Sequence, residues 1–103
     1  MKLSIQTMIL VGAFVAAPAI ADIELATNNG CLGCHAVDKK LLGPAWKDVA
    51  AEVSDRARLV DSIKNGSQGK WAAITGGMAM QANSPRVSDA DIEKLADFIL
   101  TLK

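Results

Sequence analysis

The amino-acid sequence predicts an all-α domain behind an N-terminal leader. Apolar residues recur at the three- and four-residue spacing of a helix in several segments, and residues typical of helix starts and ends stand at the borders of these segments. No segment alternates apolar and polar residues as a half-buried strand would. With 103 residues, the chain has room for one domain.

The first 21 residues, MKLSIQTMILVGAFVAAPAIA, have the layout of a secretory signal peptide. Lys2 stands near the start, an apolar core covers residues 8–17, and Ala19 and Ala21 are the small residues of an A-x-A cleavage site. A membrane-spanning helix needs about 20 apolar residues, so an uncleaved anchor is the less favoured alternative. We therefore expect cleavage after Ala21, a mature domain of residues 22–103 and no stable membrane association.

Two helices are predicted in the first half of the mature domain. Residues 22–30 form a short helix that Gly30 ends. Pro44 suits the start of a helix, and apolar residues at helical spacing place the next helix over residues 45–53.

Two further helices are predicted in the second half. Either Ser54 or Asp55 can cap a helix that runs to about residue 65, with Gly66 just past its end. Ser88 stands at the cap of the last helix, whose first turn is acidic. The apolar stripe of this helix consists of Ile92, Leu95, Ala96, Ile99 and Leu102.

The segment between these two helices has no sustained period. Residues 66–87 contain four glycines and one proline, together with Trp71, Ile74, Met78 and Met80. A structureless run of this length is unusual in a compact domain and generally forms a functional loop. We expect it to lie against a bound group.

The composition gives the mature domain few large side chains for a hydrophobic core. Lys2 is the one charged residue of the leader, so ten basic and eleven acidic residues remain, and no basic excess favours nucleic acid. The aromatic side chains are Trp46, Trp71 and Phe98. A chain of this size usually needs disulfides, a metal or a large bound group for stability.

The stretch CLGCH, residues 31–35, holds both cysteines and the only histidine. A structural zinc ion needs four ligands, but the cysteines and histidine of this chain are only Cys31, Cys34 and His35. A thioredoxin-like centre would need strands, and a disulfide closing so short a loop would stabilise weakly and leave His35 unexplained. C-x-x-C-H is the signature of covalent haem attachment. We therefore predict one haem c, held through Cys31 and Cys34, with His35 as an iron ligand.

The second axial ligand is expected to be a methionine. A single histidine excludes two histidine ligands within one molecule, and methionine is the natural alternative. The mature domain offers Met78 and Met80, both in the glycine-rich segment, and core packing is the alternative role for either.

Three blocks of the mature domain resemble the small bacterial class I cytochromes c of the c-551/c-552 type. They are GCLGCHAVDKKLLGPAWKDVAAE, IKNGSQGKW and VSDADIEKLADFIL. The resemblance implies a class I cytochrome c fold, in which four to five helices surround one haem with histidine and methionine ligands. It also implies an electron carrier and not an enzyme.

The resemblance ranks the two methionines. In that family an asparagine commonly follows the ligand methionine by three positions, and MQAN fits this pattern at residues 80–83. Met80 is therefore preferred over Met78, and Asn83 is expected to donate a hydrogen bond to the ligand sulfur. Prolines often flank the ligand in the family, and here they are absent.

Other positions carry roles implied by the same resemblance. The Pro44 carbonyl is expected to accept a hydrogen bond from His35, and the Trp71 indole to donate to a haem propionate. Gly30 and Phe98 match the contact at which the first and last helices cross.

The expected function is that of a soluble, monomeric, periplasmic carrier that takes electrons from a donor cytochrome to a terminal oxidase or reductase. The exposed haem edge is expected to lie among Leu32, Leu41, Leu42, Ala79 and Gln81. Steering charges are expected from Lys39, Lys40, Lys47 and Lys70. The alternative is a haem enzyme or gas sensor with a labile or absent methionine ligand, for which the sequence offers no distal acid–base group.

Overall fold

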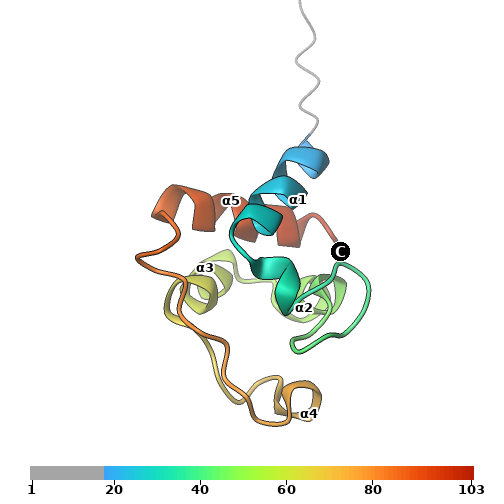
Figure 1. The fold of residues 1–103 in the computed structure, drawn as a ribbon. Helices are drawn as coiled ribbons and strands as arrows, with labels where there is room; N and C mark the ends of the chain where they lie inside the picture. Colours follow the sequence, from blue (N-terminus) through green and yellow to red (C-terminus); the bar gives the residue numbers. More distant parts are fainter. Residues whose placement is uncertain (1–17) are drawn as a thin grey trace, which may run out of the picture.

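The computed structural model describes residues 18–103, which form a small helical domain (Figure 1). In chain order its elements are α1 (Pro18–Asn28), the 3-10 helix η1 (Cys31–Gly33), α2 (Trp46–Glu52), α3 (Arg56–Asn65), α4 (Ala72–Thr75) and α5 (Asp89–Leu100). No strand occurs within these residues, so the all-α prediction is confirmed. None of the helices described is long and apolar enough to cross a bilayer.

Helix α1 begins earlier than predicted. It starts at Pro18 and not at residue 22, so it runs through the expected cleavage point after Ala21. The predicted signal peptide lies almost entirely outside the described residues and stays a prediction. At the other end of α1 the prediction is confirmed, because Gly30 adopts the left-handed conformation, with φ of 75°, that turns the chain out of the helix.

The caps of α3 and α5 show how the sequence sets their starts. The Asp55 carboxylate, and not Ser54, accepts two backbone N–H groups of the first turn of α3. The Ser88 hydroxyl accepts the Asp91 N–H at the start of α5. Helix α5 ends at Leu100, so Leu102 lies beyond the helix, although its partly buried side chain still packs on the core.

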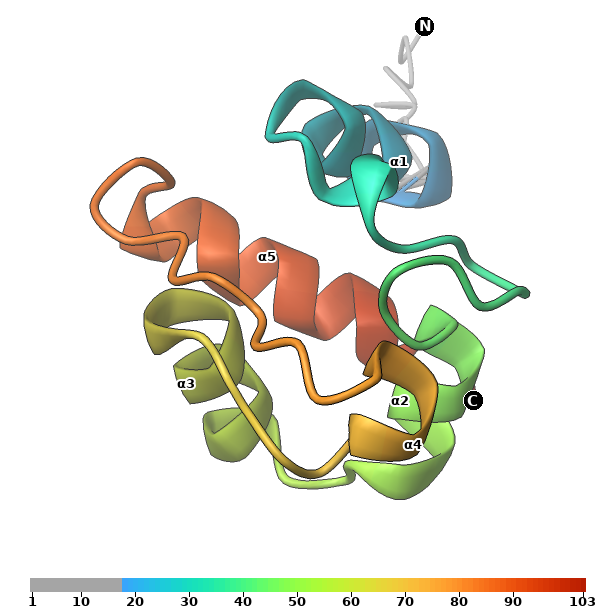
Figure 2. The same ribbon diagram turned by 60° about the horizontal axis from the view of Figure 1, so that its bottom comes forward.

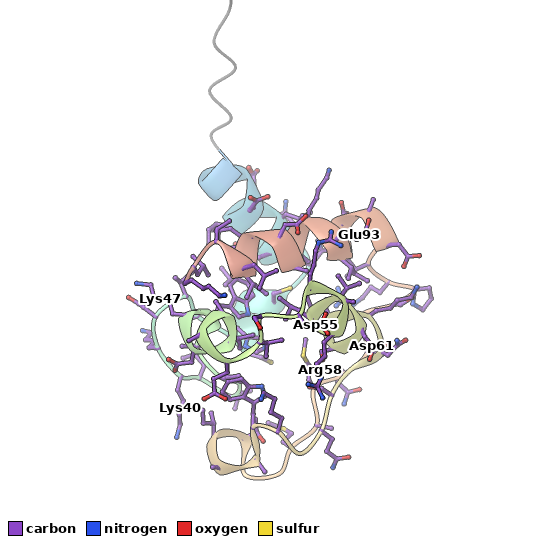
Figure 3. The ribbon with its side chains drawn as sticks, turned by 180° about the vertical axis from the view of Figure 1, so that it is seen from behind. Lys40, Lys47, Asp55, Arg58, Asp61 and Glu93 are labelled. Carbon is purple, nitrogen blue, oxygen red and sulfur yellow. The ribbon has the colours of Figure 1, made fainter. Side chains whose placement is uncertain are left out.

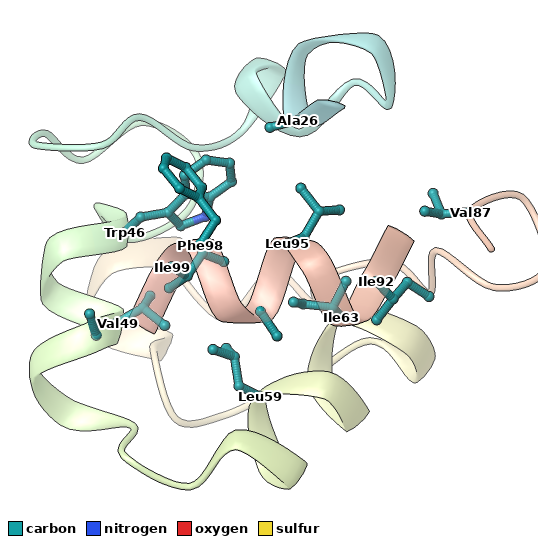
Figure 4. Close-up of a cluster of buried hydrophobic side chains, with 12 residues drawn as sticks. Ala26, Trp46, Val49, Leu59, Ile63, Val87, Ile92, Leu95, Phe98 and Ile99 are labelled. Carbon is teal, nitrogen blue, oxygen red and sulfur yellow. The ribbon is translucent and has the colours of Figure 1, made fainter. Parts of the chain in front are cut away.

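Helix α5 lies at the centre of the fold and contacts α1, α2 and α3. Its apolar face meets Ala26 of α1, Trp46 of α2 and Leu59 of α3 in one hydrophobic cluster (Figure 4). The rings of Trp46 and Phe98 meet edge to face with centroids 6.1 Å apart. Burying one such side chain contributes roughly 1.5–3 kcal/mol, so these contacts fix how α2 and α5 meet.

The expected contact between Gly30 and Phe98 stays a prediction. A Cβ atom placed on Gly30 would have no neighbour within 4 Å. Among residues 22–28 of α1, the one buried residue is Ala26, which is completely covered. Gly30 is needed for the turn that follows α1, and close approach between α1 and α5 comes from the small side chain of Ala26.

The segment over residues 66–87 is mostly irregular, as predicted, but contains two ordered features. One is the single turn of α4, at the end of the molecule opposite α1 (Figure 1). The other is an isolated antiparallel bridge between Ser67 and Met80, which joins the outgoing and returning limbs. The returning limb passes beside α3 on its way to α5 (Figure 2).

Candidate haem site

His35 follows η1 and has one fixed hydrogen-bond partner. Its Nδ1 atom lies 2.9 Å from the Pro44 carbonyl oxygen. A carbonyl can only accept, so Nδ1 carries the proton and Nε2 keeps a free lone pair. This is the tautomer that an imidazole needs to bind iron through Nε2. The hydrogen bond implied by the resemblance is therefore present.

Two further residues hold the His35 ring. A Cβ atom on Gly43 would lie 2.6 Å from the ring's Cε1 atom, so glycine is required for the chain to pass this closely. The Trp46 ring stacks on the imidazole with centroids 5.7 Å apart and an angle of 24° between planes. Neither contact has a local signal in the sequence, because only the folded chain brings Gly43 and Trp46 to the histidine.

The two cysteines lie on the same turn as His35. Backbone N–H groups of Cys34 and His35 both donate to the Cys31 carbonyl, at 3.2 and 3.0 Å, which closes the motif into one tight turn. Both thiols are free. Burial raises the pKa of the Cys31 thiol, and the positive charge of Arg86 partly opposes this rise. Two free thiols and an imidazole on one turn are the set that covalent haem attachment requires.

The structure holds the two methionines differently. Met80 is half-buried, and its backbone exchanges hydrogen bonds with Ser67 at 2.8 and 3.2 Å. Met78 is 52 % exposed, and its N–H donates to the Thr75 carbonyl at 3.3 Å, just after α4. Of the two, Met80 has the more constrained backbone and the more sheltered side chain.

Gly66 makes the bridge at Met80 possible. Its φ of 84° lies in the region that favours glycine, and a Cβ atom there would lie 2.5 Å from the Met80 carbonyl oxygen. Gly66 was predicted to stand just past the end of α3, and this prediction is confirmed. The fold gives Gly66 a second role, because the returning limb passes over it. This limb, residues 76–87, contains Met80 and is called the methionine limb below.

Asn83 and Trp71 are both partly buried near this limb. The Asn83 side-chain amide donates to the Ile63 carbonyl at 2.9 Å, while its oxygen accepts from Arg86 at 2.7 Å. Trp71 packs against the hydrophobic core at the start of α4. Within residues 18–103 neither the Trp71 indole N–H nor the second amide proton of Asn83 has a hydrogen-bond partner.

The proposed docking residues are exposed to different degrees. Leu41 and Leu42 are 39 % and 55 % exposed, and both follow Lys40, which lies on the same side of the molecule as Lys47 (Figure 3). Lys70, in contrast, makes two contacts within the chain. Its Nζ atom lies 3.7 Å from a carboxylate oxygen of Glu52 and 5.7 Å from the centre of the Trp71 ring. Its charge is therefore partly neutralised within the chain.

Comparisons with known proteins agree on one family. The cytochrome c family model matches residues 23–103. Cytochrome c-552 of Nitrosomonas europaea is 47 % identical over 86 % of this chain and 85 % of its own length. Cytochrome c-551 of Pseudomonas aeruginosa is 40 % identical over 98 % of this chain and 91 % of its own length.

Solved structures give the same result. The crystal structure of wild-type Nitrosomonas europaea cytochrome c552 superposes with a TM-score of 0.70 at 46 % identity. The superposed region covers 79 % of this chain and 99 % of the solved chain. The structure of class 1 cytochrome MtoD from Sideroxydans lithotrophicus, 30 % identical, superposes with a TM-score of 0.64.

Proposed function

Because this chain belongs to the cytochrome c family, we propose that it is a periplasmic shuttle that takes one electron from a donor cytochrome and delivers it to a terminal oxidase or reductase. The family is one of electron carriers with covalently bound haem c, and this chain supplies the residues for that group. The compartment, the donor and the acceptor are the proposed part.

The proposed anchors are the Cys31 and Cys34 thiols, and the proposed iron ligands are His35 and Met80. When bound, haem c supplies an iron that alternates between Fe(III) and Fe(II). His35 would bind the iron through Nε2, while the Pro44 carbonyl keeps the ring oriented. This hydrogen bond is the observation that carries the proposal, because it fixes both the tautomer and the direction of the ligand.

Met80 is the proposed second ligand because its backbone is held. The bridge to Ser67 fixes the main chain on both sides of the residue, whereas Met78 has a solvent-exposed side chain. With His35 and Met80 both bound to the iron, no position on it would remain open to a substrate. The chain then serves electron transfer and not catalysis.

Two side chains are proposed to support the bound group. The second amide proton of Asn83 would be donated to the Met80 sulfur, since the first is donated to the Ile63 carbonyl. The Trp71 indole N–H would be donated to a haem propionate. Both donors are free of other partners among the described residues, which is what each role requires.

Proton NMR of the reduced protein tests the ligand set. The methyl group of an iron-bound methionine lies over the porphyrin ring, so its signal should be shifted far upfield. We expect this signal in the wild type and in Met78→Ala, and its loss in Met80→Ala. Loss only in Met78→Ala would move the ligand to that residue. Absence of the signal in the wild type, together with ready binding of carbon monoxide, would favour the haem enzyme or gas sensor.

A further inference from the structure

Arg86 joins two parts of the candidate haem site that are far apart in sequence. Its Nη1 atom donates to the Asn29 backbone carbonyl at 2.9 Å, and its Nη2 atom donates to the Asn83 side-chain oxygen at 2.7 Å. Asn29 stands two residues before Cys31, and Asn83 follows Met80 by three positions. One guanidinium therefore ties the cysteine–histidine motif to the methionine limb.

The Asn29 carbonyl is a favourable partner for this cation. It lies just past the end of α1, where carbonyl groups lack partners within the helix and the helix dipole is negative. The planar guanidinium presents several N–H groups in a fixed arrangement, so it can contact two acceptors at once.

The partners of Asn83 determine how its amide is turned. An arginine can only donate, so the atom that faces Arg86 must be the amide oxygen. The Ile63 carbonyl can only accept, so the atom that faces it must be the amide nitrogen. With both ends assigned in this way, the amide cannot flip without losing both hydrogen bonds. Its second N–H is the group left over.

The backbone around Arg86 is anchored as well. The Asn83 N–H donates to the Ile63 and Lys64 carbonyls at the end of α3, and the Val87 N–H donates to the Asn83 carbonyl at 2.7 Å. Val87 itself is 2 % exposed. The guanidinium thus extends from a fixed turn, although Arg86 is exposed.

We propose that Arg86 is a positioning residue for the second axial ligand: it holds the Asn83 amide so that its free N–H serves the Met80 sulfur. This inference rests on the proposed function, in which Met80 binds the iron. It assigns to an exposed arginine a role in keeping the methionine on the iron. Arg86 acts through Asn83, so it does not need to contact Met80 itself.

Imidazole competition on the ferric holoprotein tests the proposal. Added imidazole displaces a weakly held methionine, so its apparent affinity reports how firmly Met80 is bound. We expect Arg86→Leu to bind imidazole roughly fivefold to tenfold more tightly than the wild type, the range expected for losing one charge-assisted hydrogen bond. Arg58→Leu is the matched control, since Arg58 is an exposed arginine that lines a different part of the surface with Glu52 and Lys70.

A double-mutant cycle separates positioning from a general loss of stability. In an Asn83→Ala background, Arg86→Leu should leave the imidazole affinity unchanged, because the group through which it acts is gone. An effect of the same size in both backgrounds would overturn the proposal, as would an Arg86→Leu protein that matches Arg58→Leu.

The NMR signal of the wild type distinguishes this failure from failure of the proposed function. If the shifted methionine methyl is present and Arg86→Leu has no effect on imidazole binding, methionine ligation stands and the role of Arg86 is wrong. If that signal is absent from the wild type, both are wrong.

Discussion

At the scale of single residues, the site depends on how closely the chain approaches the His35 ring. Pro44 sets the direction of the imidazole, Gly43 lies against one of its edges and Trp46 stacks on it. The Pro44 contact was predictable from the resemblance. The Gly43 contact was not, because a glycine before a proline is adequately explained by a turn.

Gly43→Ala should destabilise the protein because its new methyl group would overlap the His35 ring. The built Cβ lies 2.6 Å from Cε1, so either the imidazole or the 43–44 backbone must move. We expect a loss of about 1–3 kcal/mol in the free energy of unfolding, measured by denaturant titration. Gly33→Ala is the control, because a Cβ there meets nothing within 4 Å. Equal stability of the two variants would refute the close contact.

At the scale of elements, the caps of α3 and α5 were predicted from the sequence, whereas the bridge within the irregular segment between these helices was not. Helix caps are local: Asp55, Ser88 and Gly66 act on the turn beside them. The bridge between Ser67 and Met80 joins residues 13 positions apart and has no local signal. It forms because Gly66 permits a close approach that another residue would block.

A pair of glycine variants separates this contact from backbone strain. Gly66 and Gly69 both have positive φ values, 84° and 99°, so alanine is strained at either position. A Cβ on Gly66 would also lie 2.5 Å from the Met80 carbonyl, whereas one on Gly69 meets nothing within 4 Å. Gly66→Ala should therefore cost about 1–3 kcal/mol more than Gly69→Ala and weaken the shifted methionine signal. Thermal unfolding and NMR measure the two effects, and similar results for both variants would argue against the bridge.

The ion pair between α3 and α5 should make stability depend weakly on pH in the acid range. Arg56 donates to Asp97 at 2.6 and 3.2 Å and lowers the pKa of that carboxyl below its ordinary value. A lowered folded-state pKa stabilises the protein above the ordinary carboxyl pKa, and this contribution disappears as pH falls through the lowered pKa.

Asp97→Asn should therefore be slightly less stable than the wild type at pH 7, and the difference should shrink as the solution is acidified. The effect is small because both side chains are largely exposed. Denaturant unfolding at several pH values measures it. Asp38→Asn, at an exposed position without an ion pair among the described residues, is the control. A difference for Asp97→Asn that grows toward acid pH would contradict the assignment.

At the scale of the whole molecule, the polypeptide alone forms only a small hydrophobic core. The buried cluster of α1, α2, α3 and α5 leaves α4 and the 66–87 segment with few buried residues. The sequence indicated this shortage through its length and its few aromatics. How the methionine limb is attached could not be predicted, because it depends on Arg86 meeting Asn29, just past α1, and on Asn83 meeting Ile63 of α3.

Removing the haem attachments should abolish cooperative folding. The variant Cys31→Ala/Cys34→Ala/His35→Ala lacks both proposed anchors and one proposed iron ligand. We expect it to lose most of its far-UV circular dichroism helix signal at 25 °C, since the remaining core is marginal for a domain of this size. His35→Ala alone keeps both proposed cysteine anchors and should retain the helical signal. A triple variant that unfolds cooperatively with wild-type helicity would show that the polypeptide core suffices.

The early start of α1 bears on the predicted cleavage after Ala21. Cleavage after Ala21 would cut within a helix that begins at Pro18, so a signal peptidase would need that first turn unwound. The new amino terminus at Asp22 would place a positive charge at the positive end of the helix dipole. Asp22 and Glu24 would then stand in the first turn of the shortened helix and offset that charge. Processing would thus replace an apolar helix start with one whose acidic side chains suit its new end.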